Sequence, residues 1–346
     1  MNKKNSMTID MIPGLRALTL SPDYRNALKL PEEPAEEYEM LAQGEYNINF
    51  RFRHPVTGEK LVLRVNSESQ MHLENQIEYE GNALKLLENS GRTPVLKYIY
   101  PGDEQLTRGA LVMSFLPGRA LDYSRETELE EAAKCLAEIH GIPVDETDGL
   151  IEPEAPIRAI LEECEEMFAT YWNSELGAPD VKNRIRRLLD EGRKRIQDGG
   201  DYTGYKCCVN TELNNTNFLV EEETGTVRLV DWEKPLYSDP AQDLGHFLAP
   251  TTTFWKTDVI FENETIEKFI DTYIESVGNR YDTIGLRART MEFIVITCLR
   301  GLTWCAMAWV QYRQNGKGLT NESTRIKLDA YLTDEFLRRI EAIYGI

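Results

Sequence analysis

Three short runs of apolar or alternating hydrophobic and polar residues lie between Tyr38 and Val65, and such runs are typical of β-strands. The first run ends near Ala42, the second covers residues 46–52 and the third covers residues 61–65. A turn of composition Pro-Val-Thr-Gly at residues 55–58 lies between the last two runs. The pattern therefore predicts a hairpin at this point, within a small antiparallel sheet.

A helical spacing of hydrophobic residues follows these runs. Ile77, Leu84 and Leu87 recur at intervals that place them on one helix face, and Gly91 ends the pattern. The next apolar run, residues 111–116, is closed by Pro-Gly and predicts a further strand.

The rest of the chain is mostly of helical pattern. Thr127 and Glu130 match a capping box, Gly141 and Pro143 end that helix, and His140 is interpreted as a cap at its end. A Gly-containing turn at residues 222–225 predicts a small hairpin. Further helices are expected at 154–173, 179–198, 240–249, 264–278, 286–312 and 322–343.

Residues that could carry out catalysis lie on both sides of the small hairpin predicted at residues 222–225. Glu212 is followed five residues later by Asn217, and Asp231 ends the next apolar run. This order is that of a phosphoryl-transfer centre, in which one carboxylate orients the acceptor hydroxyl while an amide oxygen and a second carboxylate hold magnesium. The pattern thus predicts Glu212 as catalytic residue, with Asn217 and Asp231 as catalytic and metal-binding residues.

The motif Asp231-Trp232-Glu233 resembles the aminoglycoside phosphotransferase and choline kinase-like family, which carries the same three residues at its metal-binding position. The run at 238–244 also resembles the family's Gly-Asp-Pro-x-x-Asp-Leu, with Ser238 in place of the glycine. Two positions depart from the family's His-Gly-Asp, where this chain has Asn210 and Glu212.

The resemblance implies an α+β, protein kinase-like fold of two lobes: an extension at 1–37, a β-rich N-lobe at 38–117 and a helical C-lobe at 118–346. It also implies that ATP and Mg²⁺ are the cofactors. Residues 44–47 take the place of the nucleotide loop, with an ordinary turn as the alternative. Arg64 takes the place of the family's Lys or Arg on the nucleotide phosphates, with Glu80 as the helix carboxylate that pairs with it, and a solvated strand end is the alternative for Arg64. The implied nucleotide-binding residues are Gly44, Asn47, Arg64, Glu80, Ser114 and Leu116.

Composition narrows the class of partner. The 346 residues carry a net charge of -19, which argues against nucleic acid because phosphate neutralisation needs clustered Lys and Arg. An acidic surface attracts an amine-bearing acceptor, although acidity also serves solubility alone.

The apolar stretch 293–310 contains Arg300, so a buried helix is favoured over a membrane span. The polar first residues and six cysteines without a Cys-x-x-Cys pair favour a cytoplasmic protein with reduced thiols.

Three functions remain open at this stage. The first is ATP-dependent phosphotransfer to the hydroxyl of a small acceptor of the aminoglycoside, choline or amino-sugar type. The second is a pseudokinase, a nucleotide-binding module in which Asn210 and Glu212 mark lost transfer. The third is adenylyl transfer in the same cleft.

Overall fold

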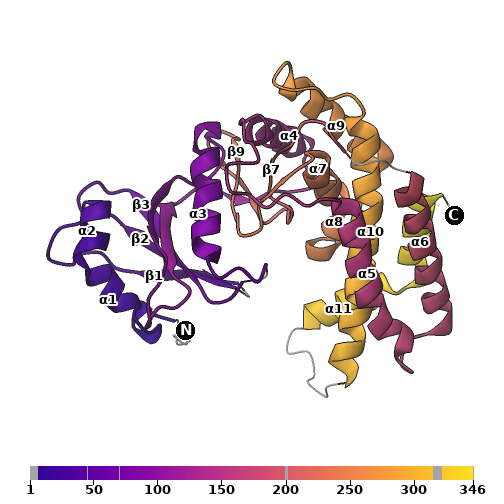
Figure 1. The fold of residues 1–346 in the computed structure, drawn as a ribbon, viewed down its shortest axis with the longest axis horizontal. Helices are drawn as coiled ribbons and strands as arrows, with labels where there is room; N and C mark the ends of the chain where they lie inside the picture. Colours follow the sequence, from indigo (N-terminus) through magenta and orange to yellow (C-terminus); the bar gives the residue numbers. More distant parts are fainter. Residues whose placement is uncertain (1–6, 45, 70, 199–201, 315–321, 346) are drawn as a thin grey trace.

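The computed structural model describes residues 7–44, 46–69, 71–198, 202–314 and 322–345. The chain forms a small lobe around an antiparallel sheet and a larger, mainly helical lobe (Figure 1). This architecture confirms the α+β fold class that the sequence predicts.

Five strands build the sheet of the N-lobe in the described residues, in the order β1-β2-β3-β5-β4. The predicted hairpin is confirmed, because the His54 N–H donates to the Glu59 carbonyl at 2.8 Å across the turn. The predicted strand at 111–116 ends earlier than expected, at Ser114, and β4 was not predicted. The strands are β1 (Glu39–Gln43), β2 (Asn47–Arg53), β3 (Lys60–Asn66), β4 (Leu96–Tyr100) and β5 (Ala110–Ser114).

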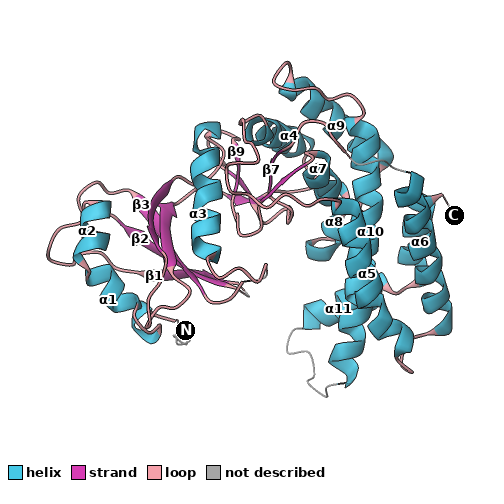
Figure 2. Ribbon diagram, viewed as in Figure 1, coloured by secondary structure: helices cyan, strands magenta, loops and turns pink. Residues whose placement is uncertain are grey.

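Helices cover both faces of this sheet, as Figure 2 shows. Helix α3 (Gln76–Leu87), which continues into η2 (Glu88–Ser90), packs on one face. On the other face lie η1 (Ile9–Met11), α1 (Leu15–Leu20) and α2 (Pro22–Leu28) from the N-terminal extension. Their side chains form a second hydrophobic core with the strands, comprising among others Leu15, Leu18, Tyr24, Leu28, Phe50, Phe52, Leu61 and Leu63.

Five short strands follow in the described part of the chain, and the loops between them hold the motif residues. One sheet has the order β6-β8-β9 and another pairs β10 with β7. The predicted hairpin at 222–225 connects β8 to β9 and is confirmed. The strands are β6 (Arg119–Ala120), β7 (Cys207–Val209), β8 (Phe218–Val220), β9 (Val227–Leu229) and β10 (Leu236–Ser238).

The C-lobe helices pack around α10, which runs beside α5 through the lobe (Figure 1). Helix α10 is long and apolar enough to cross a membrane, but 72% of its most apolar window is buried, so it is a core helix. The helices are α4 (Glu126–His140), α5 (Pro156–Asn173), α6 (Pro179–Asp198), α7 (Ala241–Leu248), α8 (Pro250–Lys256), α9 (Asn263–Val277), α10 (Leu286–Gln314), α11 (Glu322–Tyr331) and α12 (Asp334–Tyr344).

Three local predictions in this lobe were wrong. The capping box is absent, because α4 begins one residue before Thr127 and its N-cap, Arg125, makes no side-chain cap bond. The expected helix at 322–343 is two helices, since a turn at Leu332 separates them. His140 is no cap but is fully buried, with its ring between two side chains of the lobe.

Candidate active site

The loop between β7 and β8 is held by a buried carboxylate. Asp243 of α7 is 0% exposed, and its two oxygens accept the backbone N–H groups of Asn210 and Thr211, each at 2.7 Å. His140 lies 3.1 Å from the same carboxylate and 2.6 Å from the Tyr273 hydroxyl. Because buried charges need such partners, this network fixes where the loop begins. Sequence reasoning missed Asp243 and His140 as supporting residues, although Asp243 belongs to the motif at 238–244.

Asn210 connects the two motif segments. Its side-chain amide donates to the Asp231 carbonyl at 2.7 Å, and its side-chain oxygen accepts the Glu212 N–H at 3.2 Å. Thr211 and Asp231 both have left-handed backbone, with φ of 71° and 69°. Non-glycine residues adopt this conformation at a cost, so the surrounding bonds must hold it. The asparagine therefore joins the two segments, at the position where the family has histidine.

Arg64 lies at the centre of three carboxylates. Its guanidinium is 3.1 Å from Glu80, 2.7 Å from Asp231 and 3.1 Å from Glu233, and its side chain is only 5% exposed. Asn47 donates a side-chain hydrogen bond to Glu233. The sequence-predicted pairing of Arg64 with the α3 carboxylate is thus present, and the alternative of a solvated strand end is wrong.

Burial shapes the protonation of this cluster. It raises the pKa of Glu80 to about 7, although the charge of Arg64 opposes the rise. Burial also raises the pKa of Glu233 to about 7, and the nearby charge of Asp231 adds to the rise. For Arg64, burial lowers the pKa, but the attraction of the three carboxylates outweighs burial and keeps it raised.

A cavity of about 290 Å³ between the lobes collects most of the sequence-predicted residues. Glu80 and Glu212 do not line it, although Glu80 contacts Arg64, which does. Glu45 of the predicted nucleotide loop lies outside the described residues. In that loop the Gly44 N–H donates to the Asn47 carbonyl at 2.9 Å, so this amide is engaged within the hairpin. The predicted residues that line the cavity are Gly44, Asn47, Arg64, Ser114, Leu116, Asn217 and Asp231.

The predicted catalytic carboxylate has a cationic neighbour that sequence reasoning missed. Lys234 Nζ lies 3.0 Å from Glu212 Oε1, with the two side chains 18% and 27% exposed. The Asn217 side-chain amide donates to the Glu212 carbonyl at 3.1 Å, which keeps both residues in one loop geometry. The only sequence signal for Lys234 is its place directly after Asp-Trp-Glu.

The residues present fit a magnesium ion shared with phosphates. Among the described residues, no group of three or more His, Cys, Asp or Glu could hold a metal ion by itself. Asn217 and Asp231 line the same cavity, and both offer hard oxygen atoms. Mg²⁺ commonly takes one or two protein oxygens and completes its shell with water and phosphate oxygens, so this pair suffices.

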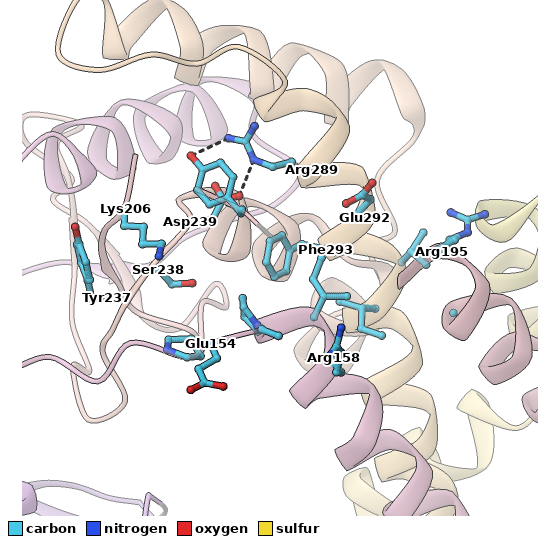
Figure 3. Close-up of a pocket in the computed structure, with 18 residues that line it drawn as sticks. Glu154, Arg158, Arg195, Lys206, Tyr237, Ser238, Asp239, Arg289, Glu292 and Phe293 are labelled. Atoms are coloured by element: carbon cyan, nitrogen blue, oxygen red, sulfur yellow. Dashed lines mark hydrogen bonds and ion pairs between the residues drawn. The ribbon is translucent and has the colours of Figure 1, made fainter. Parts of the chain in front are cut away.

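A second cavity, of about 140 Å³, lies in the C-lobe between the start of α5, the end of β10 and α10 (Figure 3). Arg289 pairs there with Asp239 at 2.6 Å and lies over the Tyr202 ring. Within the described part of the chain, none of the sequence-predicted site residues lines it. It is therefore distinct from the candidate active site.

Comparison with known proteins identifies the family. A spectinomycin phosphotransferase solved with ADP and spectinomycin superposes with a TM-score of 0.62 at 13% identity, covering 99% of this chain and 100% of that one. A choline kinase from Cryptosporidium parvum gives 0.60 at 13% identity, covering 97% and 95%. An ethanolamine kinase of Plasmodium vivax gives 0.59 at 15% identity, covering 90% and 85%. No curated protein matches the sequence. Residues 37–287, well over half of the chain, match the phosphotransferase enzyme family, and the chain therefore belongs to that family.

Proposed function

We propose that this protein is an ATP-dependent phosphotransferase that acts, with Mg²⁺, on the hydroxyl of a small molecule. The observation that carries the proposal is that Arg64, Asn217 and Asp231 line one cavity. Glu212 lies in the same loop as Asn217, whose side chain binds the Glu212 carbonyl. A cavity with a fixed cation, two metal-type oxygen donors and a nearby carboxylate has the parts that phosphoryl transfer needs.

Each residue has one role in this proposal. Arg64 binds the nucleotide phosphates, since its planar guanidinium is suited to phosphate oxygens. Asn217 and Asp231 hold Mg²⁺, which neutralises phosphate charge when bound. Glu212 orients the acceptor hydroxyl and accepts its proton. Asp243 keeps the loop in place by binding two of its amides.

The acceptor is proposed at the level of its class, a hydroxyl compound of the kind phosphorylated by the structural neighbours. Amine-bearing acceptors agree with the acidic net charge of -19. All six cysteines lie in described segments, where they are buried and free, and this agrees with a reducing, cytoplasmic location.

Two measurements test the nucleotide site and the chemistry separately. Thermal unfolding with ATP should show stabilisation that depends on Mg²⁺, about 2.7 kcal/mol at a hundred times the dissociation constant. Asp231→Asn should lose it. A coupled ADP-release screen over aminoglycosides, choline, ethanolamine, amino acids, sugars and nucleosides should find an acceptor. Absence of any Mg²⁺-dependent stabilisation would refute the nucleotide site.

Variants of Glu212 separate the enzyme from the pseudokinase. If Glu212 is the base, Glu212→Gln should abolish turnover. Glu212→Asp should impair it, because the carboxylate moves by about 1.5 Å and such misplacement costs on the order of a hundredfold in rate. If the longer side chain instead acts as a metal ligand, Glu212→Asp should raise activity. Equal rates in wild type and Glu212→Gln would show that Glu212 is not the base.

A further inference from the structure

We propose that Lys234 is a further catalytic residue, whose ammonium group leaves Glu212 during the reaction and binds the oxygens of the transferred phosphoryl group. The inference rests on the proposed function of the same site. It assigns a role to a residue that lies outside the Asp231-Trp232-Glu233 motif.

The position of the ammonium group is the first argument. Lys234 Nζ lies 3.0 Å from Glu212 Oε1. A catalytic base must lie within about 2.6–3.2 Å of the hydroxyl it deprotonates. That hydroxyl must approach phosphorus to about 3–3.5 Å before the bond forms. The ammonium group therefore lies next to the atoms that react, within reach of a side chain with four rotatable carbons.

The backbone of Lys234 is anchored while its side chain can turn. Its carbonyl accepts a hydrogen bond from the Thr211 hydroxyl at 2.8 Å, and strand β10 begins two residues later, at Leu236. The side chain is 18% exposed, so part of it reaches solvent. This combination fixes where the side chain begins and leaves its ammonium group able to change partner.

The neighbouring arginines pair with carboxylates other than the proposed base. Arg64 is paired with Glu80, Asp231 and Glu233, and Arg300 is paired with Glu163 at 2.8 Å. Lys234 differs because it pairs with the proposed base itself. When that base takes up a proton it loses its charge, and the ion pair weakens at the moment at which negative charge accumulates on the transferred group.

The step balances without a further reactant. The acceptor O–H bond breaks and its proton goes to the Glu212 carboxylate, while the acceptor oxygen forms a bond to the γ-phosphorus of ATP. The bond from that phosphorus to the bridging oxygen breaks, and its electron pair leaves with ADP. Lys234 stays protonated throughout and follows the negative charge from the carboxylate to the phosphoryl oxygens.

A purely structural role for the Lys234–Glu212 ion pair would give a different result. Both side chains are partly exposed, and ion pairs of this kind stabilise proteins little. Lys206, the residue before strand β7, forms a comparable pair with Glu152, and the two side chains are 25% and 37% exposed. Lys206 lines the second cavity and not the candidate active site. Lys206→Met is therefore the matched control for Lys234→Met.

The test compares two complexes of each variant by calorimetry. One is ADP with Mg²⁺, and the other is ADP with Mg²⁺ and aluminium fluoride, which mimics the phosphoryl group in transfer. Lys234→Met should leave the ADP affinity within about twofold and weaken the aluminium fluoride complex about a hundredfold, the usual effect of losing one oriented donor. Lys234→Arg should recover part of the loss, and Lys206→Met should match wild type. Basal ADP release without an acceptor should fall in kcat, with KM for ATP unchanged.

Two sets of outcomes are distinguishable. An aluminium fluoride complex of Lys234→Met as tight as that of wild type would overturn the role of Lys234 and leave the phosphotransferase proposal intact. An equal loss for both complexes, or the same loss in Lys206→Met, would also overturn it. A wild-type protein that binds neither complex would overturn the proposed function and, with it, this role.

Discussion

Replacing Arg64 by methionine probes the charge balance of the candidate site most directly. The substitution keeps much of the side-chain volume but removes the only guanidinium in contact with Glu80, Asp231 and Glu233 among the described residues. Glu80 is 1% exposed and Glu233 14%, so two largely buried carboxylates would lose their counter-charge. Breaking a buried pair in this way costs about 3–5 kcal/mol of stability.

The size of this loss should depend on pH. The pKa values of Glu80 and Glu233 are already raised to about 7, and without Arg64 they would rise further. A carboxyl group whose folded pKa exceeds its unfolded value contributes most stability while protonated and loses that contribution as pH rises through the folded pKa. Arg64→Met should therefore cost less at pH 6 than at pH 8.

Urea unfolding of four proteins at both pH values measures the effect: wild type, Arg64→Met, Glu80→Gln and the double variant. Glu80→Gln removes one of the stranded carboxylates, so the double variant should recover about 1–3 kcal/mol of the loss expected from additivity. Arg51→Met is the matched control, because the Arg51–Glu39 pair is 41% and 66% exposed and should change stability by less than about 1 kcal/mol. A loss below about 1 kcal/mol in Arg64→Met at both pH values, or additive losses in the double variant, would refute the coupling of these charges.

Three further expectations follow from the same structure. The folded pKa of Glu80, about 7 against an ordinary 4.5, means that stability is lost as pH rises from about 4.5 to 7, and Glu80→Gln should flatten this slope in urea unfolding between pH 5 and 8. Asp243→Ala leaves the amides of Asn210 and Thr211 without their acceptor, so their hydrogen exchange should accelerate and stability should fall by about 1–3 kcal/mol; unchanged exchange would contradict the role of Asp243. Lys29, exposed at the left-handed C-cap of α2 with φ of 56°, should stabilise the protein by about 1 kcal/mol when replaced by glycine, without changing nucleotide affinity.

The parts of the fold that depend on residues close together in the sequence could be predicted. Strand β2 alternates hydrophobic and polar residues, β3 is a mainly apolar run, and a short turn joins the two, so their pairing follows from local signals. The short helix η2, which continues α3, ends at Gly91 with φ of 65°, and this glycine is a local signal as well. The motif residues Asn217 and Asp231 were also predicted, because a hairpin between them brings their segments together.

The N-terminal extension could not be predicted because its structure depends on distant partners. Helices α1 and α2 have six and seven residues, too few for a stable helix in isolation. They are ordered by burial against the sheet, where Leu15 and Tyr24 are both 0% exposed. Nothing in the local pattern of residues 7–30 indicates which surface they would cover.

His140 shows the same limitation at the candidate site. At the end of a helix a histidine is a plausible cap, since it can complement the helix dipole. In the structure its partners are Asp243 and Tyr273, which lie 103 and 133 residues further along the chain. Periodicity in the sequence carries no information about contacts at that separation, so the support of the loop between β7 and β8 became visible only in three dimensions.

The charge balance of the cleft explains why a metal ion belongs to the proposed reaction. ATP is strongly anionic, and the protein as a whole carries a net charge of -19. Arg64 brings one positive charge to the cavity, but three carboxylates surround it. The cluster therefore offers a phosphate chain no net attraction by itself, even though Arg64 is well placed to form hydrogen bonds to it. A divalent cation held by Asn217 and Asp231 would reverse this balance. Nucleotide affinity and metal affinity should consequently rise together, because each ligand removes the charge that opposes the other.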